Sequence, residues 1–306
     1  MDQFHTWSDY LQQQAAAAGK EPCLVNLDET AVSMSPCNVK GLIVSKRWWG
    51  PRMRPSQKIS RSNLRRMVTH VCMSVGDTSL QPQLPQIFIG NHKCFSPENM
   101  ASIATEAPPN VQFWRKKSSW NTSELMCEVL KELAKVVEKH PAKQFILALD
   151  CASIHITRAV LKTAKDSNIW LLMVPARCTW LLQPLDGFTF SPYKAWLKNI
   201  YRASKNPQGH VSDLAMLRIF VRLCKEFLNS RKWELSFLCT GLVGDRTNLS
   251  RDLKALRVSA KNKPTKPLLP PPKAVLEGLW PSNRTVPYEL LLHAGIHRRK
   301  RRLILH

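Results

Sequence analysis

The sequence predicts an α/β fold in which helices cover both faces of a mixed five-stranded sheet. Strand-like apolar runs come early in the chain, and the turn signal Gly76-Asp77 between two of them predicts an antiparallel meander. Later, strand and helix patterns alternate with short connections, which predicts parallel strands joined by a right-handed crossover. Antiparallel strands followed by parallel ones give a single mixed sheet.

The elements of the first half follow from apolar patterning. A helix over residues 4–19 precedes the first strand, which is expected at 22–28. The segment 67–75 alternates in polarity and is rich in β-branched residues, and 84–89 is a second apolar run, so both are expected to be strands. These three strands form the predicted meander.

The second half is predicted from helical periodicity and short buried runs. Thr122 or Asn121 is suited to cap a helix that ends near His140, because apolar residues recur on one face of that segment. A buried strand over 144–149, a helix near 155–167 and a strand over 169–174 follow. Further helices are expected from about 187 to 230.

Composition divides the chain into four parts. We expect a helical lead-in at 1–20, the main α/β domain at 21–235, a helical extension at 236–260, and a Pro-rich linker with a basic tail at 261–306. The cluster 297–302 in that tail favours nuclear import or phosphate contact. The alternative is a disordered basic tail with no specific role.

The charge points to a polyanionic partner. Lys and Arg number 45 against 22 Asp and Glu, which gives a formal charge of +23, and nucleic acid is the leading candidate. The alternative is a basic, solvated surface.

No run reaches the roughly 18 apolar residues of a membrane span, and the nine scattered cysteines form no Cys-x-x-Cys pair, so neither a zinc knuckle nor a disulfide framework is expected. Together these features predict an intracellular, nuclear protein with free thiols.

Three aspartates are expected at the ends of apolar segments, namely Asp28, Asp150 and Asp186. Each alone is suited to a turn or an N-cap, but together they would repel one another at low dielectric. Carboxylate ligands favour a hard cation, so two Mg²⁺ or Mn²⁺ ions are expected rather than zinc. Two such ions activate an attacking oxygen and stabilise the leaving oxygen of a phosphodiester.

The motifs around these aspartates resemble the catalytic domain of pogo/Tigger-type DDE transposases, relatives of the mariner group in the ribonuclease H-like superfamily. The resemblance covers about residues 20–200 and rests on Asp28-Glu29-Thr30, on Asp150 with His155, and on the Pro175–Lys194 block with Leu182-Gln183-Pro184-Leu185-Asp186. It implies a ribonuclease H-like fold for the domain at 21–235. It also implies that Asp28, Asp150 and Asp186 are the catalytic, metal-binding triad.

Neighbouring residues receive weaker assignments. His155 is a catalytic candidate that contacts the scissile phosphate or fixes a ligand, and the alternative is a helix cap. Glu29 is favoured as a structural carboxylate, since adjacent strand residues point to opposite faces. Thr179 and Gln183 are expected to order the loop. Basic and aromatic residues suit nucleic-acid contact: Lys46, Arg47, Trp48, Arg52, Arg54, Arg65, Arg66 and Lys116.

Two functions are compatible with these features. The first is a metal-dependent DNA endonuclease and strand transferase that acts at transposon ends. The presence of all three aspartates favours this first function. The second, the alternative, is a domesticated, non-catalytic DNA- or chromatin-binding protein; in its favour, only about 20 residues precede the first strand, too few for the helix-turn-helix module of such transposases. The expected partner is DNA, either transposon ends or nonspecific duplex. No association with a membrane is expected, and the sequence leaves open whether the protein forms a homodimer.

Overall fold

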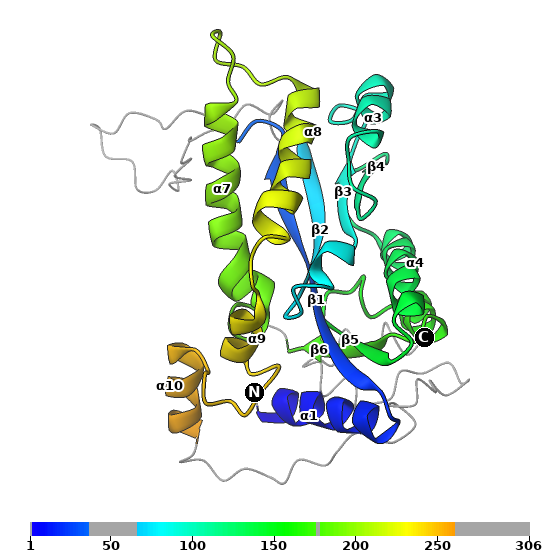
Figure 1. The fold of residues 1–306 in the computed structure, drawn as a ribbon, viewed down its shortest axis with the longest axis vertical. Coiled ribbons are helices and arrows are strands. Elements are labelled where there is room, and N and C mark those ends of the chain that lie inside the picture. Colours follow the sequence, from blue (N-terminus) through cyan, green and yellow to red (C-terminus); the bar gives the residue numbers. More distant parts are fainter. Residues whose placement is uncertain (1, 37–65, 176–177, 261–306) are drawn as a thin grey trace, which may run out of the picture.

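A computed structural model describes residues 2–36, 66–175 and 178–260 of the chain. One six-stranded sheet with the order β4-β3-β2-β1-β5-β6 organises the described residues. Figure 1 shows helices α7 and α8 on one side of the strands and α4 on the other. The predicted α/β class, with helices flanking a mixed sheet, is therefore confirmed.

The strand directions match the prediction. Strand β1 is antiparallel to β2, and β2 is antiparallel to β3, which is the expected meander. On its other side β1 is parallel to β5, and β5 is parallel to β6. The strand bounds are β1 (Glu21–Ser33), β2 (Met67–Val75), β3 (Gln86–Gly90), β4 (Val111–Arg115), β5 (Lys143–Asp150) and β6 (Trp170–Val174).

The sheet has one more strand than predicted. Strand β4 pairs in parallel with β3 at the edge far from β6. Its five residues follow Pro108-Pro109, and only its first residue, Val111, is buried. A short segment with so little apolar patterning gives a weak strand signal, and its pairing depends on the position of β3.

Strand β1 is longer than predicted, so Asp28 lies within the strand rather than at its end. Pairing with β5 stops at Asn26↔Ala148, whereas pairing with β2 continues to Ser33↔Met67. Asp28 therefore lies two residues beyond the last parallel pair, where one edge of β1 loses its strand neighbour. The apolar run ends at Asp28 because the pairing with the parallel strand β5 ends near there. The backbone of β1 continues as a strand because it still pairs with β2.

The helices have the following bounds: α1 (Asp2–Ala17), α3 (Pro97–Ala104), α4 (Ser123–Lys139), α5 (Arg158–Asp166), α6 (Thr179–Leu182), α7 (Phe190–Ala203), α8 (Asp213–Arg222), α9 (Glu234–Thr240) and α10 (Arg251–Ala260). Two π-helical segments, η3 (Leu185–Thr189) and η4 (Leu223–Leu228), continue directly into or out of α-helices. Thr122 caps α4, as predicted, by accepting from the Leu125 N–H. Thr157, and not His155, caps α5.

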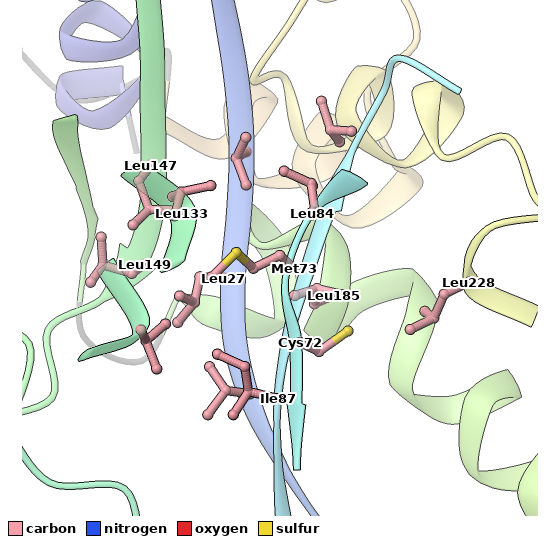
Figure 2. Close-up of a cluster of buried hydrophobic side chains, with 14 of the residues drawn as sticks. Leu27, Cys72, Met73, Leu84, Ile87, Leu133, Leu147, Leu149, Leu185 and Leu228 are labelled. Carbon is pink, nitrogen blue, oxygen red and sulfur yellow. The ribbon is translucent and has the colours of Figure 1, made fainter. Parts of the chain in front are cut away.

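The core extends across both faces of the sheet. Figure 2 shows Leu27 of β1 beside Met73 of β2, with Leu147 and Leu133 to one side and Leu185 to the other. All of these side chains are fully buried, and burying a leucine contributes about 1.5–3 kcal/mol. Leu185 directly precedes Asp186, so core packing fixes the position of the third aspartate.

The cysteines within the described ranges, which leave out Cys37, are all free. No helix in the described ranges has both the length and the apolar character needed to cross a membrane.

Candidate carboxylate site

A buried amide links the three segments that carry the aspartates. Asn26 is fully buried in β1. Its Nδ2 donates to the carbonyl oxygen of Ala148 in β5 at 3.0 Å, and its Oδ1 accepts from the N–H of Leu185 in η3 at 2.9 Å. Asp28 lies two residues further along β1 and so has its side chain on the same face as Asn26. Asn26 therefore holds β1, β5 and η3 together beside the carboxylates.

Gln183 connects two of the aspartates directly. In the amide orientation that satisfies both ends, its nitrogen donates to Oδ2 of Asp28 at 3.2 Å and its oxygen accepts from the N–H of Asp150 at 3.1 Å. Oδ1 of Asp28 accepts from the Glu29 N–H at 2.8 Å. Gln183 is fully buried, so the loop-ordering role expected for it has a defined geometry. Its amide ties the segment before η3 to β1 and β5.

Asp186 lies in the first turn of η3 and is exposed, although Leu185 before it is buried. The segment from β6 to Asp186 passes through helix α6, whose last residue, Leu182, is also fully buried. Asp186 is thus carried by a π-helical turn rather than by a strand end. The apolar residues of the Leu182–Asp186 block anchor that turn in the core.

The third carboxylate, Asp150, is the last residue of β5. Its Oδ1 accepts from the Ala152 N–H at 2.9 Å and contacts Nδ1 of His155 at 2.7 Å. Nε2 of His155 lies 3.1 Å from Oε1 of Glu29, and Nδ2 of Asn121 donates to the same oxygen at 2.6 Å. The His155 side chain is 1% exposed. The imidazole therefore contacts two carboxylates of this site, and it is not open to solvent.

The environment shifts the pKa values of the ionisable groups of the site in different directions. Burial and the nearby charges of Asp186, Glu29 and Asp150 raise the pKa of Asp28 to about 8. Burial opposes a charged imidazole, but the hydrogen bonds to Asp150 and Glu29 outweigh it and raise the pKa of His155 to about 10. Burial likewise opposes ionisation of Asp150, yet the His155 contact keeps the pKa of that carboxyl below its usual range. The site therefore favours a charged imidazole beside an ionised Asp150 and disfavours ionisation of Asp28.

The donor set suits a hard divalent cation. Among residues 2–36, 66–175 and 178–260, no group of three or more His, Cys, Asp or Glu side chains is placed so that it could hold a metal ion. The donors themselves are carboxylate oxygens, which Mg²⁺ and Mn²⁺ favour. Burial, and after it repulsion from the neighbouring carboxylates, raises the pKa of Asp28, and a divalent cation would remove that repulsion. Asp28, Asp150 and Asp186 are the residues that would hold it.

The residues expected to contact nucleic acid have different environments. Arg66 forms an ion pair with Asp213. Lys116 pairs with Glu128 at 2.8 Å and lies 5.4 Å from the ring centre of Trp114. Both cations therefore already have acidic partners. The other six, Lys46, Arg47, Trp48, Arg52, Arg54 and Arg65, lie outside the described residues.

Two site residues were missed from the sequence. Asn26 stands inside the apolar run that ends at Asp28, and a polar side chain in a buried strand is costly unless it is hydrogen-bonded. That mismatch was a usable signal for Asn26. Asn121 was considered only as a helix cap, and its contact with Glu29 joins residues 92 positions apart. No local pattern reports a contact of that kind.

The fold and the site together define an α/β domain with a mixed six-stranded sheet, in which carboxylates of β1 and β5 lie where these two strands separate. The model of the DDE superfamily endonuclease family matches residues 65–226, just over half of the chain. The chain therefore belongs to this family. Asp150 and Asp186 lie within the matched segment, and Asp28 lies before it.

Individual proteins show weaker similarity. The MFS-type transporter clz9 of Cochliobolus lunatus is 29% identical over 128 residues, which are 41% of this chain and 14% of that protein. The Mos1 transposase paired-end complex with left transposon end is 15% identical with a TM-score of 0.34, and the Mos1 mariner paired-end complex with Mn is 15% identical with a TM-score of 0.33. Each match to Mos1 covers 78% of this chain and 61% of the other. The chain thus spans only a small part of clz9 and less than two thirds of Mos1.

Proposed function

We propose that this protein is a metal-dependent DNA endonuclease and strand transferase of the transposase type. The observation that carries the proposal is geometric: Gln183 bridges Asp28 of β1 and Asp150 of β5, and Asn26 ties β1 and β5 to η3, which carries Asp186. A binding surface for phosphate gains nothing from gathered negative charge, whereas a metal-dependent phosphodiester reaction requires it. Membership of the DDE superfamily endonuclease family supports the same activity.

The roles of the residues follow from their contacts. Asp28, Asp150 and Asp186 would hold two Mg²⁺ or Mn²⁺ ions, which supply activation of the attacking oxygen and stabilisation of the leaving oxygen at a transposon-end phosphate. His155 positions Asp150, because its buried ring contacts Oδ1 of Asp150 at 2.7 Å. Gln183 and Asn26 fix the spacing of the three segments. His155 is thus a positioning residue in this proposal, in place of the catalytic role that the sequence predicts for it.

DNA is the proposed substrate, and the charge of +23 supports a polyanionic partner. A DNA substrate also supports a nuclear location. The basic cluster 297–302 would serve import, and it lies outside the described residues. We retain the expected catalytic domain at 21–235 as part of the proposal.

The proposal is tested by nicking of supercoiled plasmid with Mg²⁺, with Mn²⁺ and with EDTA. Asp186→Asn is the most informative variant, because Asp186 is exposed and its loss leaves the core intact. Asp166→Asn, an exposed position in α5, is the matched control. We expect metal-dependent nicking by the wild type and the control and at least about a 100-fold loss in Asp186→Asn, since each catalytic group supplies several kcal/mol.

The alternative function has a distinct result in the same assay. Tight, salt-sensitive DNA binding with no nicking in either metal would identify a non-catalytic DNA- or chromatin-binding protein. Nicking that persists unchanged in Asp186→Asn would contradict the assignment of the carboxylates.

A further inference from the structure

Helix α7 begins four residues after Asp186, and the ionic side chains of this helix are all cations. Lys194, Lys198 and Arg202 are exposed. We call these three residues the α7 stripe. None of them was among the residues expected from the sequence to contact nucleic acid.

The stripe is a continuous feature of one helix face. Its members are four residues apart, so they follow one another with a rise of about 6 Å and lie within about 80° of arc. Tyr193, Leu197 and Tyr201 repeat with the same spacing and are buried. These apolar residues fix the rotation of α7, which leaves the cations facing outward. The stripe extends about 12 Å along the helix from Lys194.

Acidic residues are absent from this part of the sequence. No Asp or Glu occurs between Asp186 and Asp213. The other described helices of seven residues or more each contain at least one acidic residue. Within the described part of the chain, no ion pair involves the stripe, whereas Arg66 and Lys116 have carboxylate partners. The positive charge of the stripe is therefore not neutralised by neighbours there.

We propose that the α7 stripe binds the phosphate backbone of the DNA duplex that leads away from the scissile phosphate. The proposal rests on the proposed function for its location, because the stripe starts close in sequence to Asp186 and η3, which carries Asp186, runs directly into α7. Three successive cations with a regular rise match a chain of phosphates better than a single anion. Contacts of this kind contribute affinity and orientation rather than sequence specificity.

The test compares two variants of the full chain with equal loss of charge. The first replaces Lys194, Lys198 and Arg202 with Gln. The control replaces three exposed cations of α4 and α5 with Gln: Lys139, Arg158 and Lys162. Helices α4 and α5 pack together, and Figure 1 shows α4 on the side of the strands away from α7. Binding to a labelled duplex is measured by anisotropy in EDTA over a range of salt concentrations.

We expect the stripe variant to bind at least about tenfold more weakly at 0.1 M salt, with a salt slope shallower by about two to three, since each phosphate contact contributes about 0.9 to the slope. The control variant should change the slope by less than about one. An equal loss in both variants would overturn the proposal, because net charge alone would then explain binding. Unchanged binding by the stripe variant, or no duplex binding by the wild type, would overturn it as well.

Nicking assays separate this proposal from the proposed function. If both hold, the stripe variant needs more DNA to reach half-maximal rate but keeps its rate at saturating DNA within about twofold, since uniform binding energy changes KM and not kcat. If the wild type never nicks but the binding results hold, the catalytic proposal fails and the stripe remains a DNA-binding surface. If nicking depends on metal but binding does not depend on the stripe, only the present inference fails.

Discussion

Nδ1 of His155 lies 2.7 Å from Oδ1 of Asp150, so the carboxylate at the end of β5 is held by a buried imidazole. The other ring nitrogen lies 3.1 Å from Oε1 of Glu29 in β1. The ring therefore bridges β1 and β5 at the point where the two strands separate. It balances negative charge without occupying the face that Asp28 shares with Asn26.

Replacing this imidazole should destabilise the fold in a pH-dependent way. His155→Gln should lower the free energy of unfolding by about 2–3 kcal/mol at pH 7, because hydrogen bonds to charged groups are lost. The pKa of His155 is raised to about 10, so the stabilisation is fully present below the ordinary histidine pKa and is lost as the pH rises through 10. Urea unfolding between pH 6 and 10 measures this. The two proteins should converge at the alkaline end, and His210→Gln, at an exposed position, should behave like the wild type.

A carboxylate in place of Gln183 should disrupt the site. Gln183→Glu adds a further acidic group beside Asp28 and removes the donor to its Oδ2. We expect a loss of about 1–3 kcal/mol in unfolding free energy without divalent metal, from one unsatisfied buried contact. Thermal unfolding in EDTA measures it. Gln208→Glu, at an exposed position, should have almost no effect, and an equal effect of both changes would show that Gln183 has no special role.

Asn26 should be required to keep η3 in place. Asn26→Leu leaves the Ala148 carbonyl and the Leu185 N–H without the partner they have in the native protein. The expected cost is about 2–4 kcal/mol for two buried polar groups. In the Asn26→Leu variant, hydrogen exchange at the Leu185 amide should also be faster than in the wild type. Asn199→Leu on the exposed face of α7 is the control, and an unchanged Leu185 exchange rate in Asn26→Leu would contradict the proposed link.

Divalent cations should stabilise the wild type. At 100 times Kd, Mg²⁺ or Mn²⁺ should add about 2.7 kcal/mol to the free energy of unfolding. The pKa of Asp28 is raised to about 8, so protons compete with the metal below that value and the stabilisation should grow as the pH rises through 8. Melting curves at pH 6.5 and 8.5 with metal and with EDTA measure it. Asp28→Asn should lose the response and Asp166→Asn should retain it; a response that survives Asp28→Asn would place the metal elsewhere.

His70 should make the protein sensitive to acid. Its ring is fully buried, stacks on Phe88 at 4.0 Å between centroids, and lies with Nδ1 2.7 Å from the hydroxyl of Tyr193. Burial lowers the pKa of His70 to about 3. The unfolded chain binds a proton near pH 6.5 and the folded one does not, so stability is present above pH 6.5 and is lost as the pH falls toward 3, by about 1.4 kcal/mol per pH unit.

The measurement is the free energy of unfolding between pH 4 and 7 for the wild type and His70→Gln. The variant should be less stable at pH 7 but should lose less stability on acidification. His92→Gln, at an exposed position, is the control. A slope in His70→Gln as steep as that of the wild type would show that other groups cause the acid sensitivity.

Local patterns predicted most of the secondary structure. The β-branched alternation of 67–75 corresponds to β2 (Met67–Val75), and the cap at Thr122 marks the start of α4. The sequence pattern failed to predict strand bounds and strands that depend on pairing with another strand. Strand β1 continues past its apolar run because β2 still pairs with it, and β4 forms because β3 offers a free edge. Such pairings join distant residues, so no short window of sequence contains them.

By itself the sequence determined the α/β class, the strong positive charge and the three aspartates, because periodicity, composition and motif spacing are properties of the chain alone. Tertiary structure decided the rest. Only the fold shows that β5 stops pairing at Asn26↔Ala148, which opens the strand edge at Asp28. Only the fold brings His155 between Asp150 and Glu29 and buries Leu185 beneath Asp186. The physical reason is that burial and charge coupling depend on distances in space between residues far apart in the chain.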